Sequence, residues 1–427
     1  MSELLNLKIN YLKKESIMLI KNAIFPTKNG LEKRDVLIKE GKIVTIAPNI
    51  DNGDEEILDA NGLYLLPGII DLNVRFSNSI LNQVHIDKLS NSCLNGGVTT
   101  AVVMSDFSPR LDSATLLELV KFKIDQSKID LKISAPLADK KEDQLNNIAT
   151  LLNNGAAAIL ADSHRNANLL RRGLQYASMK NRPLFCNCYE PNLDDNGLMN
   201  EGFISAKLGL SGISTISETS EVAKVSELAL FYGASVVFKS LSTKRSLDIV
   251  KGYKSLNSTL YTEVSIHHLC KDDTACDGFN TYAKIMPPLR DEKEKNALIE
   301  ALKSGEIDIL TSAHSPKSIL YKDVAFEDAE FGIGCVEEFL SLCYTYLVKQ
   351  EKIDFETLSK MCSLNPAHVL GLKTKGKVEE GYDADLILFD PNYAFEVSNT
   401  NSLYCGDKLF GKVKKVIVGG KVNNIRD

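Results

Sequence analysis

Two histidines and an aspartate have the clearest capacity for metal chemistry in this sequence. Asp162 and His164 come at the end of the apolar segment AAAILADSH, and His314 follows the apolar segment IDILTSA. Imidazole nitrogens and carboxylate oxygens are common zinc ligands, and two histidines with one carboxylate can hold an ion that keeps a position open for water. Whether these side chains meet depends on the elements that carry them.

Nucleophilic and anion-binding side chains are also present. Cys186 and Cys188 form a C-x-C pair on an expected strand, so both thiols point to the same face. The sequence places no histidine–aspartate pair beside Cys188 to activate it, and packing is therefore the predicted role of both thiols. Arg290 and Lys317 are cations that could contact an anionic ligand, and Arg290 could equally hold its own loop in place.

Apolar strands alternate with amphipathic segments of helix length through the middle of the chain. The helical segments include ATLLELVKFKIDQ, ANLLRRGLQYASM and EKEKNALIEALKSG. This alternation is typical of a parallel sheet closed into a (β/α)-barrel, whose functional side chains stand at the carboxyl ends of the strands. The predicted strands are, in order, TTAVVM, LKISAPL, AAAILA, PLFCNC, SVVFKS, LYTEVS and IDILTSA.

The two ends of the chain share a different pattern, with short strands separated by turns. IMLIKNAIF and DVLIKEGKIVTIAP stand near the beginning, and GKVEEGYDADLILFDP and GKVKKVIVGGKVNN stand near the end. This pattern predicts that both ends meet in one composite β-sandwich beside a distorted (β/α)8 TIM barrel. The predicted divisions are an N-terminal arm (1–16), a first sandwich segment (17–66), the barrel (67–365) and a second sandwich segment (366–427).

The composition favours a cytoplasmic protein with small-molecule or protein partners. The 427 residues carry a formal net charge of −6 without a basic stripe, which argues against nucleic acid and against a membrane surface. The nine cysteines are odd in number and follow no repeated spacing, so no disulfide framework is expected. No secretory leader pattern or long apolar run is found, and a reducing cytoplasm is the expected compartment.

Seven motifs in a fixed order carry a family resemblance. They cover nearly the whole chain: LLPGIIDLNV (65–74), NGGVTTAVVM (95–104), IHHL (266–269), KIMPPLRDEKEKNAL (284–298), SAHSP (312–316), LNPAHVLGL (364–372) and KGKVEEGYDADLILFDP (375–391). In this order the chain resembles the dihydroorotases of the amidohydrolase superfamily. It resembles in particular the long type that associates with aspartate carbamoyltransferase in pyrimidine synthesis.

The resemblance implies a zinc-dependent hydrolase whose ligands this chain has largely lost. In the family, one or two zinc ions activate water. Their ligands are an H-x-H after the first barrel strand, a carboxylate or carboxylated lysine after the fourth, histidines after the fifth and sixth, and an aspartate after the eighth. Asp162 alone keeps the expected chemistry. The degenerate positions fall on Asn73, Arg75, Asn187, Ser240 and Ala313. No catalytic residue, metal or other cofactor is therefore expected, and His267 and His268 are expected to be structural.

The lost ligands predict a new ion pair. An amide is a poor zinc ligand and a guanidinium cannot become one, so Asp162 would be left without a cation. Arg75 projects from the former ligand position of the first strand, and we expect its guanidinium to bind Asp162 and replace part of the metal charge. His314 follows the lost aspartate and His164 lies in a loop beyond Asp162, which disfavours a relocated zinc site.

The sequence therefore predicts a non-catalytic dihydroorotase-like protein that forms a complex with the catalytic subunit of aspartate carbamoyltransferase. The partner is implied by the resemblance alone, and a homo-oligomer is also compatible with the chain. Two alternatives stay open. One is an active metal-dependent dihydroorotase or related cyclic amidohydrolase with an atypical site. The other is a protein that binds a small anion without turnover, with Arg290, His314 and Lys317 as ligand contacts.

Overall fold

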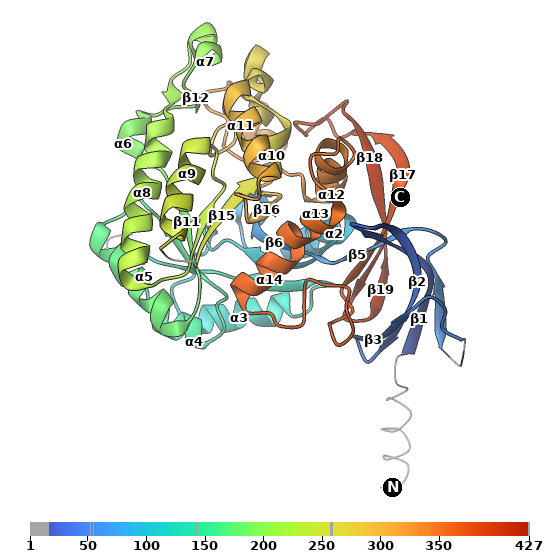
Figure 1. Ribbon diagram of the computed structural model, residues 1–427. Coiled ribbons are helices and arrows are strands. Elements are labelled where there is room, and N and C mark those ends of the chain that lie inside the picture. Colours follow the sequence, from blue (N-terminus) through green and yellow to red (C-terminus); the bar gives the residue numbers. More distant parts are fainter. Residues whose placement is uncertain are drawn as a thin grey trace.

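The computed structural model of the chain places a barrel beside a large β-sheet (Figure 1). It describes residues 17–425 except 52, 54, 140, 142, 143, 257 and 258. The predicted N-terminal arm (1–16) lies outside the described residues. Within the described part, no helix has the length and apolar character needed to cross a membrane.

Eight strand positions form the predicted barrel, and all neighbouring strands pair in parallel. The short strands β8 and β9 are separated only by Ser134, and together they form the third position. A bridge between Val74 and His314 closes the barrel, and the Arg75 amide donates to the His314 carbonyl at 2.7 Å. The barrel part of the predicted fold class is thus confirmed. The strands are β6 (Ile69–Val74), β7 (Val98–Val103), β8 (Asp130–Ile133), β9 (Ala135–Pro136), β10 (Ile159–Asp162), β11 (Leu184–Asn187), β14 (Val236–Lys239), β15 (Leu260–Ser265) and β16 (Ile309–Thr311).

Amphipathic helices cover the outside of the barrel. In α5, one face buries Leu170 and Leu174, Asn166 caps the first turn by accepting from the Asn168 amide at 2.9 Å, and Asn181 ends the helix in the left-handed region. The longer helices are α2 (Gln83–Asn95), α3 (Ala114–Ile124), α5 (Ala167–Lys180), α8 (Thr215–Tyr232), α9 (Lys244–Lys254) and α11 (Glu292–Lys303). The shorter helices are α4 (Ile148–Asn153), α6 (Pro191–Asp194), α7 (Phe203–Leu208), α10 (Ile266–Cys270), α12 (Phe339–Cys343), α13 (Phe355–Ser359) and α14 (Asn365–Leu370).

Helical turns and one small sheet complete the barrel region. The 3-10 turns are η1 (Ser77–Ser79), η2 (Asp273–Phe279), η3 (Thr281–Ala283), η4 (Ile319–Tyr321) and η5 (Val336–Glu338), and the π-helical turns are η6 (Tyr344–Val348) and η7 (Lys360–Leu364). Strands β12 (Met199–Asn200) and β13 (Gly212–Ile213) pair in the excursion between α6 and α8.

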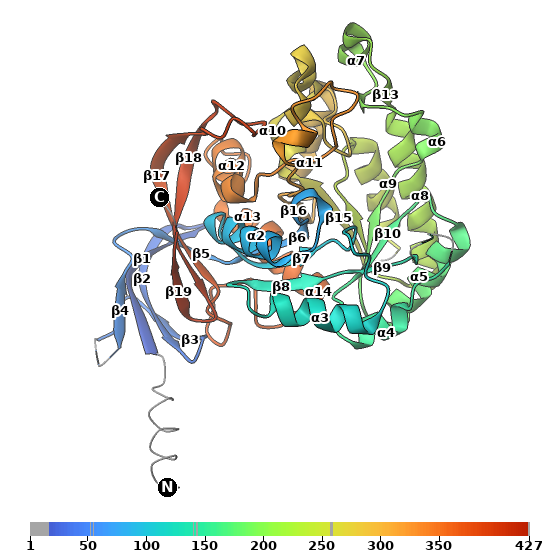
Figure 2. The same cartoon turned by 180° about the vertical axis from the view of Figure 1, so that it is seen from behind.

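Strands from both ends of the chain form one eight-stranded sheet, as the sequence predicts. Its order is β19-β18-β17-β5-β1-β2-β3, with β4 paired to β1. The two ends join where β5 pairs antiparallel with β17, with Leu66 opposite Ile387. Helices α2 and α12 lie between this sheet and the barrel (Figure 2). The strands are β1 (Ile17–Thr27), β2 (Gly30–Lys39), β3 (Lys42–Ala47), β4 (Glu56–Asp59), β5 (Tyr64–Pro67), β17 (Leu386–Glu396), β18 (Lys408–Val418) and β19 (Lys421–Asn424).

Helix α14 fills the bottom of the barrel. Ala367, Val369 and Leu370 join an apolar cluster with inward-facing strand residues such as Leu72 and Phe185. The sequence assigned everything after residue 365 to the sandwich, but the chain returns to the sheet only at β17. Residues 365–370 therefore belong to the barrel, because their apolar side chains complete its interior.

Candidate functional site

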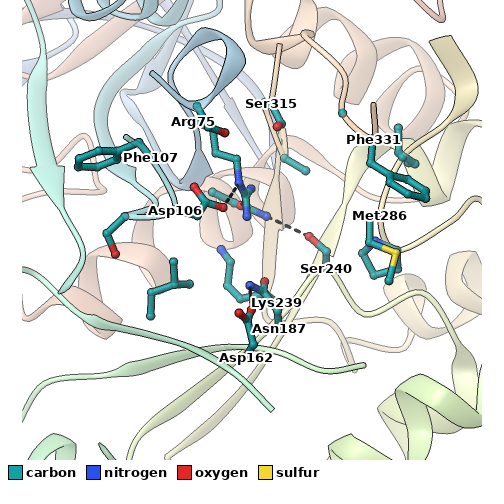
Figure 3. A pocket seen from close by; sticks show the side chains of 18 of the residues that line it. Arg75, Asp106, Phe107, Asp162, Asn187, Lys239, Ser240, Met286, Ser315 and Phe331 are labelled. Atoms are coloured by element: carbon teal, nitrogen blue, oxygen red, sulfur yellow. Dashed lines mark hydrogen bonds and ion pairs between the residues drawn. The ribbon is translucent and has the colours of Figure 1, made fainter. Parts of the chain in front are cut away.

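A cavity of about 970 Å³ lies at the carboxyl ends of the barrel strands (Figure 3). This end of a (β/α)-barrel is where side chains from different strands converge. Every position that the family pattern assigned lines the cavity, and these residues are Asn73, Arg75, Asp162, Asn187, Ser240 and Ala313. The six positions that the motifs assigned to separate strands thus meet at one cavity.

Arg75 binds Asp106, which follows the adjacent strand, and does not bind Asp162. Its Nε donates to Asp106 Oδ2 at 2.6 Å and its Nη1 donates to Asn73 Oδ1 at 3.0 Å. Asp162 instead accepts from Asn187 Nδ2 at 2.9 Å, and its Oδ2 lies 3.8 Å from Arg165 Nη2. The predicted Arg75–Asp162 ion pair is wrong because Asp106 follows the adjacent strand β7, whereas Asp162 lies on the fourth strand and is solvated and paired there.

A buried ion pair that the sequence reasoning missed occupies the centre of the site. The ammonium of Lys239 contacts the carboxylate of Glu263, and the two side chains are only 1% and 0% exposed. The lysine Nζ also donates to the Leu72 carbonyl at 2.8 Å. Burial lowers the pKa of Lys239, and the charge of Glu263 opposes this shift. The described residues thus place a protein cation among the strand ends.

The amide of Asn73 joins this ion pair to Arg75. Its Nδ2 donates to Glu263 Oε1 at 2.8 Å, while its Oδ1 accepts from Arg75. Thr311 Oγ1 donates to the same Glu263 oxygen at 2.8 Å. The position where the family pattern has a histidine ligand is therefore part of a continuous hydrogen-bond network.

A signal for the ion pair was present in the sequence. Lys239 ends the apolar strand VVFK, and Glu263 lies within LYTEVS. An isolated charge in a buried strand implies a partner, and the two charges are opposite in sign on consecutive strands. The register, with Phe238 opposite Thr262, brings the next residues of β14 and β15 to adjacent positions.

The three proposed ligand contacts have different surroundings. Arg290 is buried outside the cavity wall, and its Nε and Nη1 donate to Ser242 Oγ at 2.9 Å and to the Ile213 carbonyl at 2.7 Å. These contacts tie the loop that carries Arg290 to the segments around Ser242 and Ile213. His314 also lies behind the wall, whereas Lys317 lines the cavity and pairs with Glu330 at 2.6 Å.

His314 is not available as a metal ligand. Its Nδ1 accepts from the Cys335 and Val336 amides, both at 3.2 Å, and burial lowers its pKa to about 3. His164 packs its ring 4.6 Å from that of Tyr189. The relocated zinc site built from Asp162, His164 and His314 does not form.

The adjacent histidines His267 and His268 line the cavity but bond to the protein. The Nδ1 of His267 pairs with the Tyr404 hydroxyl at 2.7 Å, and the Nδ1 of His268 pairs with Ser265 Oγ at 2.7 Å. Burial lowers the pKa of His267 to about 3 and that of His268 to about 4, so both rings are neutral near pH 7. Their contacts tie α10 to neighbouring segments.

The thiols of Cys186 and Cys188 lie 3.9 Å apart in the buried interior. Burial raises the pKa of Cys188 well above that of a free thiol, which keeps it protonated. A protonated thiol without an activating base is a weak nucleophile. The pair therefore fills the core.

The fold of the protein is shared with solved structures. L-hydantoinase (dihydropyrimidinase) from Arthrobacter aurescens superposes with a TM-score of 0.86 at 19% identity, over 96% of each chain. D-hydantoinase (dihydropyrimidinase) from a Thermus species gives a TM-score of 0.81 at 24% identity, over 95% of this chain and 94% of that one. The chain thus has the barrel-and-sheet fold of the hydantoinases.

The chain belongs to the amidohydrolase family, whose model matches residues 193–423. Its relatives include dihydroorotases. The dihydroorotase of Ruminiclostridium cellulolyticum is 34% identical over 420 residues, covering 94% of this chain and 97% of the relative. The dihydroorotase of Carboxydothermus hydrogenoformans is 34% identical over 387 residues, covering 89% and 90%.

The residues at the strand ends do not fit the zinc that the family resemblance implies. Zinc binds thiolates, neutral imidazoles and carboxylates, whereas four of the expected positions here offer two amides, a hydroxyl and a methyl group. Among the described residues, no group of three or more histidine, cysteine, aspartate or glutamate side chains could hold a metal ion. Arg75 and Lys239 stand at the same place, already paired with Asp106 and Glu263, and neither a guanidinium nor an ammonium has a lone pair to bind zinc.

Proposed function

We propose that this chain is a non-catalytic dihydroorotase homologue that supports aspartate carbamoyltransferase by forming a complex with it. The observation that carries the proposal is the Lys239–Glu263 ion pair, which stands with Asn73 among the strand ends. It supplies an internal cation to a site whose metal ligands have been replaced.

The loss of the ligand set removes the usual route to a nucleophile. Hydrolysis of a cyclic amide near pH 7 needs an activated water, and a bound metal supplies it by lowering the pKa of that water. Asp162 is the one carboxylate kept at the assigned positions, and it is already paired with Asn187 and Arg165. A single carboxylate in that setting is a poor replacement for a metal centre.

A chain that keeps the fold but not the metal ligands can still form a protein interface. The chain matches dihydroorotases over nearly its full length, and the strand-end chemistry is not needed for docking. Stable interfaces depend on buried apolar or aromatic anchors surrounded by a polar rim. The choice of aspartate carbamoyltransferase as partner rests on the resemblance to the long dihydroorotases.

The first experiment is elemental analysis and an assay with dihydroorotate. We expect less than stoichiometric zinc and no hydrolysis. The matched control is Asp162→Ala, which removes the one retained carboxylate. Zinc near one per chain, with hydrolysis that Asp162→Ala abolishes, would support the alternative of an active hydrolase with an atypical site.

The second experiment tests the partner. The chain is co-expressed with aspartate carbamoyltransferase from its own cell and analysed by size-exclusion chromatography. We expect co-elution and a higher activity or stability of the partner. The variant Asn73→His with Arg75→His should leave the complex intact, since both residues lie inside the cavity. Separate elution with unchanged transcarbamoylase activity would leave the complex without support, and elution of the chain alone as a larger species would indicate a homo-oligomer.

A further inference from the structure

Lys239 is a buried amine that faces the barrel-mouth cavity. It lines the cavity, and its ammonium lies 5.1 Å from the centre of the Phe185 ring. Among the described residues, its acceptors are the Glu263 carboxylate and the Leu72 carbonyl. An ammonium has three protons, so one N–H direction is left without an acceptor in the described part of the chain.

The two oxygens of Glu263 have different surroundings. Oε1 accepts from Asn73 and Thr311, both at 2.8 Å. Oε2 faces the Lys239 ammonium and has no other donor among the described residues. A proton can therefore move from Lys239 to Oε2 while Oε1 stays anchored. Such a transfer would expose the lone pair of a primary amine at the cavity.

Arg75 offers a carboxylate contact near this amine. Its Nε and Nη1 are used by Asp106 and Asn73, whereas its Nη2 has no partner among the described residues. Figure 3 shows Arg75 and Lys239 directed into the same space. The positive charge of Arg75 is one of the causes that lower the pKa of Lys239, which also indicates that the two groups are near each other. A guanidinium is the side chain best suited to hold a carboxylate.

We propose that Lys239 captures a small 2-oxo acid as an imine, with the carboxylate of the acid held by Arg75. This inference goes beyond the proposed function and does not depend on it, because binding an oxo acid requires neither zinc nor a partner protein. A buried lysine beside a proton acceptor is the arrangement with which proteins form imines with carbonyl compounds.

The steps balance with water as the only by-product. Glu263 Oε2 takes a proton from the Lys239 ammonium, and Nζ then forms a bond to the carbonyl carbon, giving a carbinolamine once a proton moves from nitrogen to oxygen. Glu263 returns its proton to the hydroxyl, which leaves as water while the nitrogen lone pair forms the C=N bond. The product is a positively charged iminium beside a restored carboxylate.

The surroundings favour this product because the number of buried charges does not change. Before the reaction, an ammonium faces the Glu263 carboxylate, and afterwards an iminium faces it. No charge is stranded in the interior, which would be costly. A purely structural ion pair would have the same contacts, so only a chemical test separates the two roles.

Borohydride trapping tests the proposal directly. The full-length protein is incubated with pyruvate and then with sodium borohydride, which reduces an imine to a stable secondary amine, and the adducts are located by peptide mass spectrometry. We expect labelling at Lys239 to be at least about tenfold above that at exposed lysines such as Lys33 and Lys421, because a held carboxylate raises the local concentration of the carbonyl.

Two variants serve as controls, and thermal unfolding verifies that each is folded. Lys239→Arg keeps the positive charge but has no primary amine, so the label at this position should vanish. Arg75→Met should lower labelling by pyruvate but not by propanal, which has no carboxylate. Labelling of Lys239 in the native protein no stronger than that of exposed lysines would overturn the proposal, and equal loss with both carbonyl compounds would overturn the role of Arg75. Zinc analysis and co-elution with aspartate carbamoyltransferase are unaffected by either result.

Discussion

Replacing Lys239 by methionine should destabilise the protein more than most single changes. Methionine nearly keeps the volume of the side chain but removes the charge, and Glu263 is then left buried without its cation. Breaking a buried pair in this way typically costs about 3–5 kcal/mol. Asn73 and Thr311 still donate to Oε1 of the carboxylate, so we expect the lower end, about 3 kcal/mol. Urea unfolding followed by circular dichroism measures the change.

A double variant and an exposed pair test this reasoning. Adding Glu263→Gln to Lys239→Met removes the unpaired buried charge. The double variant should therefore be about 2 kcal/mol more stable than the sum of the two single effects predicts. The exposed pair Lys207–Asp277 is the matched control, with side chains 48% and 49% exposed, and Lys207→Met should cost less than about 1 kcal/mol. Equal effects of the two lysine substitutions, or strict additivity in the double variant, would refute a central role for the buried pair.

Three further predictions concern acid, metal and one loop. The folded pKa values of His267 and His314 (about 3) and His268 (about 4) lie below the ordinary 6.5, so the unfolded chain binds more protons between these values and stability falls as the pH falls. From pH 7 to 5, each histidine should lower the free energy of unfolding by about 2 kcal/mol. Glu338 partly offsets this loss, because burial raises its pKa to about 7. Free energies of urea unfolding that do not fall over this range would contradict the prediction. Dialysis against EDTA should leave Tm unchanged within about 1 °C, and a fall of several degrees would reveal a bound metal. Arg290→Lys should cost about 1–2 kcal/mol in urea unfolding and speed proteolysis near residue 213, because an ammonium cannot reproduce the fork of contacts; wild-type stability and cleavage would contradict it.

The barrel and the composite sheet could be predicted because their patterns are local. Strands such as PLFCNC and SVVFKS are apolar on both faces, which is typical of a parallel sheet covered by helices. The short strands at each end share a different pattern, and this pattern predicted that the two ends meet. The structure joins them through β5 and β17. The boundary predicted between barrel and sandwich at residue 365 was wrong, because the apolar face of helix α14 packs into the barrel interior. From the sequence alone, the same face could equally pack against a sandwich.

The interior of the candidate site could be predicted only in part. The family pattern located the positions that line the cavity, because strand order fixes which residues reach its mouth. It could not indicate which charges pair, since that depends on distances across the barrel. Arg75 binds the carboxylate of Asp106 on the adjacent strand end. The sequence carries the two opposite charges of Lys239 and Glu263, but the register of β14 and β15 decides that they pair.

The antiparallel pairing of β5 with β17 has a consequence for synthesis on the ribosome. Strand β17 begins about 320 residues after β5 ends, so the first sheet strands leave the ribosome long before their partners exist. At roughly 5–20 residues per second, the wait is of the order of 15–60 s. During that time the backbone groups of β5 that later bond to β17 are unpaired, and an exposed strand edge is prone to pair with other chains. A chain arrested before Leu386 should therefore bind chaperones or aggregate more readily than the finished protein.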